Sequence, residues 1–202
     1  MRLYSRGDCP FCWKVRLAMA ELGNPAELVE VRLGEKHPDV VALNPGGTVP
    51  VLVDGGLVLG ESAVIVEYLA DIGGGGLLPT NAAARAQART VHAYSDSKVG
   101  AALRDIVFEK RARPSGPWDE SRLAAAEAAW RACQSVLARW LGSRTFFAGD
   151  AYSLAECALG PRFALAEHYG AAVDPAQREL CAWMARVRAR PSWAAAAPAG
   201  FP

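Results

Sequence analysis

Two cysteines near the N-terminus have the spacing of a reactive thiol pair. Cys9 and Cys12 enclose Pro10 and Phe11 in a Cys-x-x-Cys pattern. A thiolate is a nucleophile that exchanges with disulfides, whereas a thiol is not, so the chemistry depends on which sulfur has a lowered pKa. No second Cys or His pair stands at metal-binding spacing in the sequence, which argues against a structural zinc site. A redox pair and two inert core thiols remain as interpretations.

The residues around the pair predict a strand that leads into a helix. Residues 1–4 form a short apolar start, and residues 14–22 have a helical pattern, with Pro10 suited to the first helical position. Unpaired N–H groups and the positive end of the helix dipole stabilise an anion at a helix start. We therefore expect Cys9 to have the lower pKa, with Cys12, one turn further on the same face, able to resolve a mixed disulfide.

The composition is typical of a globular protein that acts on small molecules. Of the 202 residues, 51% are hydrophobic, which is enough for a packed core. The 22 basic and 21 acidic residues are well mixed, so neither nucleic-acid nor membrane binding is expected. Lys14 and Arg16, beside the cysteine pair, are expected to be solvated. Because the N-terminus lacks a long apolar segment and the other three cysteines lie singly in helical patterns, we expect a cytoplasmic location.

The patterns that follow predict a βαβ unit joined to a ββα unit. Residues 28–31 have the alternation of a second strand, and residues 40–43 form a short helical turn. Residues 49–53 and 57–59, separated by Asp-Gly-Gly, predict a hairpin. Residues 62–70 predict the helix after it.

A change of composition divides the chain. The Gly- and Pro-rich segment 73–81 separates an α/β domain, residues 1–72, from an Ala-rich helical domain, residues 82–202. In the helical domain, helices are predicted over residues 82–113, 119–141 and 175–190. The tail 194–202 is rich in Ala and Pro, and we expect it to be loosely ordered.

Two polar groups of the helical domain are interpreted as structural. Ser153 and Glu156 have the spacing of a capping box, in which each side chain satisfies a backbone N–H at a helix start, so a further helix should begin there. We interpret this pair as a folding element and not as an acid–base pair. The histidines His37, His92 and His168 are scattered, and we assign them no chemistry.

Two features of the α/β domain could hold a peptide-like ligand. A cis bond before Pro50 would leave the backbone of Val49 free to pair with an extended ligand, although a trans proline on an edge strand is the alternative. Ser62 could serve only as the N-cap of its helix, or its hydroxyl could also bind a ligand carboxylate. Glu61, beside it, could then hold a ligand amine.

Four segments resemble, in order and spacing, the cytosolic glutathione transferase superfamily. They are residues 9–12, 44–52, 61–69 and 149–156. The resemblance spans almost the whole chain and implies an α/β plus all-α fold, in which a thioredoxin-like N-terminal domain (βαβ–ββα) precedes an all-helical C-terminal domain. With Cys9 followed by Pro-Phe, the chain is similar to the cysteine-containing branch, which comprises omega-like and dehydroascorbate-reductase-like enzymes with a glutaredoxin-like N-terminal domain.

The resemblance implies glutathione as co-substrate and no metal. The backbone of Val49 would pair with the cysteinyl part of glutathione, and Glu61 and Ser62 would hold the γ-glutamyl end. Lys36 would contact glutathione near its carboxylate, although taken alone it reads as a solvated surface lysine. The implied glutathione-binding residues are Phe11, Lys36, Thr48, Val49, Pro50, Glu61 and Ser62.

The function implied is glutathione-dependent thiol transfer or reduction, with Cys9 and Cys12 as catalytic residues and a homodimeric assembly. The second substrate, an electrophilic, disulfide or glutathionylated compound, would lie between the domains near Tyr94, Lys98 and Phe108. Conjugation of glutathione to electrophiles is one alternative, and a non-catalytic interaction protein of the stringent-starvation type is another. Omega-like sequences usually lack the second thiol, so Cys12 leaves open whether the mechanism uses one thiol or two.

Overall fold

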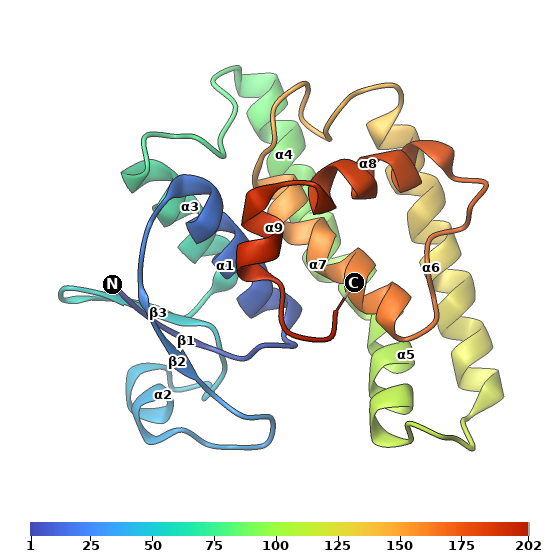
Figure 1. The fold of residues 1–202 in the computed structure, drawn as a ribbon, viewed down its shortest axis with the longest axis horizontal. Helices are drawn as coiled ribbons and strands as arrows, with labels where there is room; N and C mark the ends of the chain where they lie inside the picture. The colour runs from blue at the N-terminus through green and yellow to red at the C-terminus, as the bar shows by residue number, and fades with distance from the viewer. Residues whose placement is uncertain (202) are drawn as a thin grey trace.

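The computed structural model describes residues 1–201, which form a four-stranded sheet with its helices and a larger helical part beside it (Figure 1). The strands are β1 (Arg2–Ser5), β2 (Glu27–Glu30), β3 (Val51–Asp54) and β4 (Leu57–Leu59). Their order is β2-β1-β3-β4, with β2 parallel to β1, and with β3 antiparallel to both β1 and β4. The helices of this part are α1 (Pro10–Leu22), α2 (Pro38–Leu43) and α3 (Ser62–Ile72). This mixed sheet confirms the predicted thioredoxin-like N-terminal domain.

Alternate residues of the central strands face opposite sides of the sheet. Leu3 and Leu52 belong to the main hydrophobic core, which also takes in the apolar residues of α1 and α3. Tyr4 and Val51, their neighbours in sequence, pack instead with Val40 of α2 in a smaller cluster. The sheet is therefore covered on both faces, and α1 is held between the sheet and the helical part.

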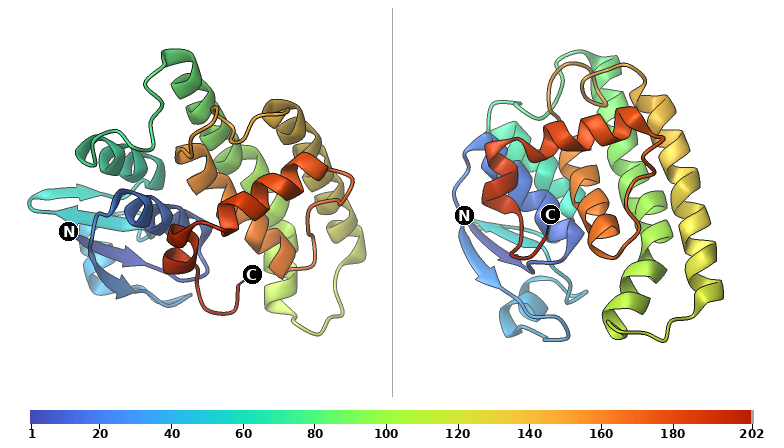
Figure 2. Two further views of the ribbon diagram at one scale, coloured as in Figure 1. Left: turned by 45° about the horizontal axis from the view of Figure 1, so that its top comes forward. Right: turned by 45° about the vertical axis from the view of Figure 1, so that its right-hand side comes forward.

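The second part is all-helical, as predicted. Its helices are α4 (Ala82–Tyr94), the π-helical η1 (Ser95–Val99), α5 (Gly100–Ala112), α6 (Glu120–Leu141), α7 (Leu154–His168), α8 (Arg178–Arg188) and α9 (Pro191–Ala196). The predicted long helix 82–113 exists, with the π-helical segment inserted at its middle. Helix α7 is buried along most of its length and packs against α1 and α4, so it forms the centre of the molecule (Figures 1 and 2).

The start of α7 has the predicted capping box. Ser153 Oγ accepts a hydrogen bond from the N–H of Ala155, and Glu156 Oε2 accepts one from the N–H of Ser153 at 2.9 Å. The other oxygen of Glu156 accepts from the N–H of Phe147 at 2.8 Å. Burial raises the pKa of Glu156, against these hydrogen bonds. The carboxylate is thus used by neighbouring backbone groups, in agreement with its interpretation as a folding element.

The prediction that the tail 194–202 is loosely ordered was wrong for residues 194–201, and residue 202 lies outside the described residues. Helix α8 ends at Arg188 and a separate helix, α9, follows and packs against α1. Trp193 of α9 is buried, and its ring lies 4.8 Å from that of Trp13. Phe201 stacks on His168 with ring centroids 4.3 Å apart. Two aromatic residues in an Ala- and Pro-rich segment anchor it, because each buries a large apolar area.

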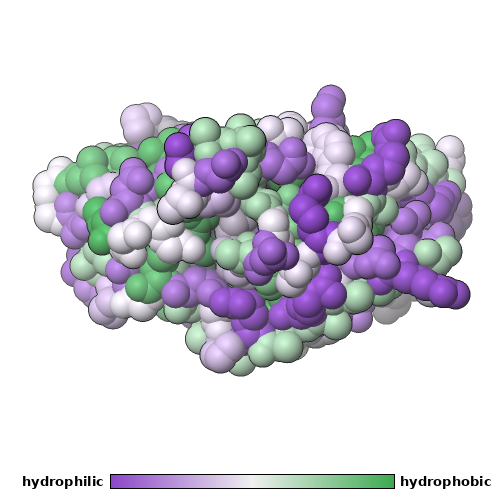
Figure 3. Space-filling view, turned by 90° about the horizontal axis from the view of Figure 1, so that it is seen from above, coloured by the Kyte–Doolittle hydropathy of each residue, from purple (hydrophilic) through white to green (hydrophobic). Residues whose placement is uncertain are grey.

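The surface fits the mixed composition. The face in Figure 3 shows hydrophilic and hydrophobic residues interspersed, without one sharply bounded apolar region. Within residues 1–201, every helix is either too short or too polar to cross a membrane.

Candidate active site

One end of the sheet brings the predicted ligand-binding segments together. The register pairs Tyr4 of β1 with Val51 of β3, and Leu52 of β3 with Leu59 of β4. The end of β1, the start of β3 and the end of β4 therefore lie side by side. The residues that adjoin these three strand ends include Cys9, Pro50 and Ser62.

Cys9 stands at the N-cap of α1 with an extended backbone and no side-chain capping bond. The Cys12 thiol, as a hydrogen-bond donor, lowers the pKa of Cys9, whereas burial raises it. The N–H groups of Cys12 and Phe11 and the charge of Arg6 lower it further, to a value of about 6. Burial raises the pKa of Cys12 far above the ordinary value, and the neighbouring Cys9 raises it further. At neutral pH the pair is thus one thiolate and one thiol.

The segment before β3 has the features that a backbone-pairing site needs. The Val49–Pro50 peptide bond is cis, and within residues 1–201 the backbone of Val49 makes no hydrogen bond to another backbone group. Thr48 and Lys36 are exposed. A free N–H and C=O beside a helix start suit an extended, peptide-like ligand.

The start of α3 differs from the sequence-based expectation. Ser62 is the first helical residue and Glu61 holds the N-cap position, where its side chain makes no capping bond. Ser62 is buried, with 6% of its surface exposed, whereas Glu61 is exposed. The N–H groups of the first turn of α3 are consequently not satisfied by the Glu61 side chain, which leaves them available to an anionic group.

Asn44 is a positioning residue whose role its place in the sequence does not reveal. Its Nδ2 donates to the Thr48 carbonyl at 3.0 Å and lies 3.1 Å from Thr48 Oγ1, and its Oδ1 accepts from the N–H of Gly46. A Cβ at Gly60 would lie 3.1 Å from Asn44 Nδ2. Asn44 therefore holds the loop before Pro50 against the turn that precedes α3.

Cys9 opens on a cavity of about 380 Å³ between the two parts of the molecule. Its walls come from the loop after β1, the start of α1, the η1–α5 segment and α7. Of the residues predicted for a second substrate, Phe108 lines this cavity. Tyr94 and Lys98 are not among its lining residues within the described chain, and the ring of Tyr94 packs on Trp140 at 4.8 Å.

Lys14 is buried, so the expectation that it is solvated was wrong. Its Nζ donates to Asp96 Oδ2 at 2.6 Å and lies 2.8 Å from His92 Nε2. Burial lowers the pKa of Lys14. Burial alone would raise the pKa of Asp96, but the hydrogen bond from His92 and the charge of Lys14 lower it to about 2. This cluster ties α1 to the helical domain at the π-helical segment.

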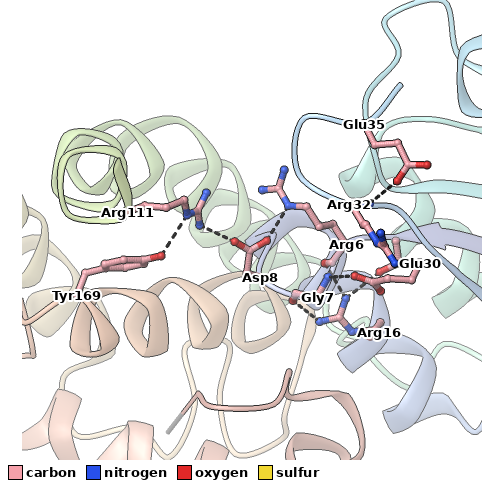
Figure 4. Close-up of polar contacts among 10 residues, drawn as sticks. Arg6, Gly7, Asp8, Arg16, Glu30, Arg32, Glu35, Arg111 and Tyr169 are labelled. Atoms are coloured by element: carbon pink, nitrogen blue, oxygen red, sulfur yellow. Dashed lines mark hydrogen bonds and ion pairs between the residues drawn. The ribbon is translucent and has the colours of Figure 1, made fainter. Parts of the chain in front are cut away.

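Arg16 is also partly buried, and it shapes the loop that carries Cys9. Its guanidinium donates to Ser5 Oγ and to the carbonyls of Arg6 and Gly7, at 2.8, 3.1 and 2.7 Å. Figure 4 shows this guanidinium below the loop. The expectation that Arg16 is solvated was therefore wrong.

Asp8 joins the same loop to the helical domain. It accepts hydrogen bonds from Arg6 at 2.7 Å and pairs with Arg111 of α5 at 2.8 Å, so it lies between two guanidinium groups (Figure 4). Arg111 in turn donates to the hydroxyl of Tyr169. The residue next to Cys9 is thus fixed from both parts of the molecule.

Comparison with known families shows the family to which the chain belongs. Residues 3–75 match the family "Glutathione S-transferase, N-terminal domain", and residues 103–191 match "Glutathione S-transferase, C-terminal domain". The chain belongs to the glutathione S-transferase family. A probable glutathione S-transferase of rice, GSTU6, is 31% identical over 94% of this chain and 84% of its own length.

Two further proteins show the range of this family. A stringent starvation protein A homolog of Coxiella burnetii is 29% identical over 87% of this chain and 80% of its own length. A glutathione transferase family member of Pseudomonas fluorescens, solved with two glutathione molecules bound, has a TM-score of 0.87 and 25% identity, and the alignment covers 100% of this chain and 92% of that one. The predicted superfamily and fold are thereby confirmed for this glutathione S-transferase.

Proposed function

We propose that this glutathione S-transferase is a glutathione-dependent thiol transferase or reductase of the cysteine-containing, omega-like branch, and that Cys9 is its nucleophile. The observation that carries the proposal is the start of α1. There Cys9 takes the position of a capping group, has a pKa of about 6 and opens on the interdomain cavity. A serine or tyrosine hydroxyl would not be ionised there at neutral pH, whereas this sulfur is.

The proposed reaction is two thiol–disulfide exchanges. The Cys9 thiolate attacks the glutathionyl sulfur of a mixed disulfide; a Cys9–glutathione disulfide forms, and the substrate sulfur leaves as a thiolate. The thiolate of a second glutathione then attacks the glutathionyl sulfur held on Cys9. Oxidised glutathione forms and the Cys9 thiolate is regenerated, so that two electrons pass from glutathione to the substrate.

In this proposal Cys12 is a hydrogen-bond donor and not the resolving nucleophile. Cys12 has 0% of its surface exposed, and burial is the largest cause of its raised pKa. Because burial and not the charge of Cys9 is the largest cause, Cys12 in this proposal stays a thiol and attacks slowly. The route that uses both thiols is the alternative, and Cys12→Ser separates the two.

Glutathione fits the end of the sheet that carries Pro50 and the start of α3. Val49 offers free backbone groups, and Ser62 is the first residue of α3, whose first-turn N–H groups the Glu61 side chain leaves uncapped. Glu61 is exposed beside it and suits the ligand's amine. Phe11, Thr48 and Lys36 complete the proposed binding residues.

The test compares wild type, Cys9→Ser and Cys12→Ser in glutathione-coupled reduction of hydroxyethyl disulfide and of dehydroascorbate. Loss of turnover in Cys9→Ser alone supports the route with one thiol. Comparable loss in both variants supports the route with two. Full turnover in Cys9→Ser would overturn the proposal.

Conjugation of glutathione to an electrophile is a second candidate, which the rice relative supports. In that reaction the protein activates the sulfur of glutathione itself, so Cys9 is not consumed. Conjugation to a chlorinated aromatic compound should then survive Cys9→Ala.

A binding role without catalysis is a third candidate, and the Coxiella relative supports it. The paired features of a lowered Cys9 pKa and a free Val49 backbone favour catalysis, because an interaction module needs neither. Failure to bind immobilised glutathione would favour the interaction role.

A homodimer and a cytoplasmic location, which the resemblance and the composition imply, are part of the proposal. Light scattering on the purified protein and fractionation of cells test them.

A further inference from the structure

The cavity beside Cys9 has an excess of positive charge. Its charged lining residues are Arg6, Arg104, Arg111, Arg162 and Asp96. Asp96, the acidic member, already accepts a hydrogen bond from Lys14 and lies 3.4 Å from His92. Besides the Cys9 thiolate, the wall therefore carries four guanidinium groups and one carboxylate, which Lys14 and Arg162 share.

Arg162 of α7 is the clearest sign that the cavity accepts an anion. Its surface is 7% exposed, and among residues 1–201 its Nη2 has no hydrogen-bond partner. The nearest carboxylate oxygen, Oδ1 of Asp96, is 3.7 Å away, beyond hydrogen-bond distance. A buried charged donor without an acceptor is costly, so a ligand that supplies an acceptor would be bound favourably there.

Gly100 leaves the space that Arg162 occupies. A Cβ at this position would lie 3.0 Å from Arg162 Nη2 and 3.1 Å from Cζ, which would displace a guanidinium that is otherwise enclosed. On its other side the guanidinium lies 4.5 Å from the ring centre of Phe11. Arg162 is thus held in a slot between α5 and the residue two positions after Cys9.

The remaining arginines are incompletely neutralised. Arg6 and Arg111 share the single carboxylate of Asp8, at 2.7 and 2.8 Å (Figure 4). Arg104 lies 3.5 Å from Asp105, which a second arginine, Arg122, holds more closely at 2.8 Å. Each of these pairings has more cations than carboxylates.

The rest of the lining is apolar. It includes Phe11, Leu103, Val107, Phe108 and Leu165. The residues proposed for glutathione, other than Phe11, do not line the cavity within the described chain. The arginines therefore face the position of the second substrate and not that of glutathione.

We propose that the second substrate is an organic anion, namely a disulfide or electrophile with an apolar or aromatic body and a carboxylate. The body would contact Phe11 and the apolar wall, while the carboxylate would pair with Arg162 and Arg104. This inference rests on the proposed thiol chemistry of Cys9. A volume of about 380 Å³ is enough for one aromatic carboxylate of this kind.

The test uses two aromatic disulfides, the dianionic 5,5′-dithiobis(2-nitrobenzoate) and the neutral 2,2′-dithiodipyridine, without glutathione. In each case the Cys9 thiolate attacks one sulfur; a Cys9–aryl disulfide forms, the S–S bond of the reagent breaks, and an aryl thiolate leaves with the electron pair. Cys9→Ser, run in parallel, subtracts the reaction of the other cysteines. The quantity compared is the ratio of the two rate constants, anionic over neutral, divided by the same ratio for free glutathione.

We expect this normalised ratio to be about ten at low salt. It should fall as salt is added, because the attraction between the arginines and the anionic reagent is electrostatic. Arg104→Gln and Gly100→Ala should each lower the normalised ratio severalfold. Gly100→Ala removes no charge and acts by displacing the Arg162 guanidinium. Arg122→Gln is the matched control, since Arg122 pairs with the same Asp105 but is not a lining residue, and it should leave both rates unchanged. Melting temperatures establish that each variant is folded.

A normalised ratio of one or less in folded wild type would overturn the inference. An equal fall of the normalised ratio in Arg104→Gln and Arg122→Gln would also overturn it. So would a rise in the KM for glutathione in Arg104→Gln as large as the fall in the ratio, since the arginines would then bind glutathione. If hydroxyethyl disulfide is still reduced in a Cys9-dependent way, only the anion preference has failed. If Cys9 reacts with neither reagent and hydroxyethyl disulfide is not reduced, the proposed function has failed as well.

Discussion

Helices α1 and α7 both begin at a buried capping residue, and their first turns differ in how the free N–H groups are satisfied. At α7, Ser153 and Glu156 accept hydrogen bonds from the backbone around them. At α1, the capping position holds Cys9, whose side chain makes no capping hydrogen bond. The Cys12 thiol and, to a smaller extent, the N–H groups of the first turn lower the pKa of Cys9. Side chains that accept hydrogen bonds from the N–H groups of a helix start stabilise the fold. N–H groups that face a thiol instead stabilise its reactive anion.

Cys9 and Cys157, one from each of these helices, show the same contrast. Cys157 lies inside α7, where burial raises its pKa above the ordinary value. Cys9 is also buried, yet donors directed at its sulfur outweigh burial and lower its pKa. At Cys157 the hydrogen bond with Tyr152 does not offset burial, so the balance between burial and donors decides whether a cysteine is reactive.

The largest expected effect comes from removing the anion at α1. Cys9→Ser should lower reduction of hydroxyethyl disulfide by about a thousandfold or more, because a hydroxyl at this position is not ionised at neutral pH. Stopped-flow or coupled spectrophotometric assays measure it. Thermal unfolding should change little, and a loss of activity caused by unfolding would contradict this reading.

Removing the acceptor at α7 should affect stability instead. Glu156→Ala leaves the N–H groups of Phe147 and Ser153 without their buried acceptor, so we expect a loss of about 3 kcal/mol in the free energy of unfolding. Urea denaturation measures it. Cys9 in the folded fraction should keep its rate of alkylation, and a changed rate would show that the two helix starts are coupled.

The third prediction concerns the pH dependence of Cys9. Only the thiolate is alkylated, so the rate with iodoacetamide should rise with pH through a midpoint of about 6, well below the ordinary cysteine value of 9.0. Cys12→Ala removes the donor with the largest effect and should move the midpoint upward, whereas Cys12→Ser keeps a donor and should move it less. Equal midpoints in all three proteins would exclude Cys12 as the cause.

The smallest expected effect is that of Ser153→Ala. Ser153 Oγ caps the N–H of Ala155 and donates to Glu156, and loss of an N-cap typically costs about 1 kcal/mol. Thermal or urea unfolding measures this loss. A loss as large as that of Glu156→Ala would show that the serine, and not the carboxylate, organises the start of α7.

The amino-acid sequence was sufficient for features that depend on neighbours along the chain. The helix after Cys9, the Asp-Gly-Gly hairpin and the Ser153–Glu156 capping box each follow from residue types a few positions apart, and all are present. The order of the four segments that resemble glutathione transferases predicted the fold in the same way.

Features that depend on distant segments were not predictable. Lys14 reads as an ordinary charged residue of a helix, and only the packing of α1 on α4 and η1 places it against Asp96 and His92. The tail 194–202 was predicted to be loosely ordered from its many Ala and Pro residues, yet its Phe201 and the preceding Trp193 anchor it. In both cases the contact that fixes the segment joins residues far apart in sequence, and no local sequence pattern indicates it.

The sequence by itself determined that a cysteine stands at the start of a helix in a glutathione transferase fold, because local sequence patterns indicate helix starts and strand order. The tertiary structure decided that the thiol opens on a cavity lined by four arginines from three separate segments. Charge accumulates there because α5 and α7 pack beside the loop after β1. Chain spacing cannot reveal this, since the electrostatic field in a cavity depends on distances through space.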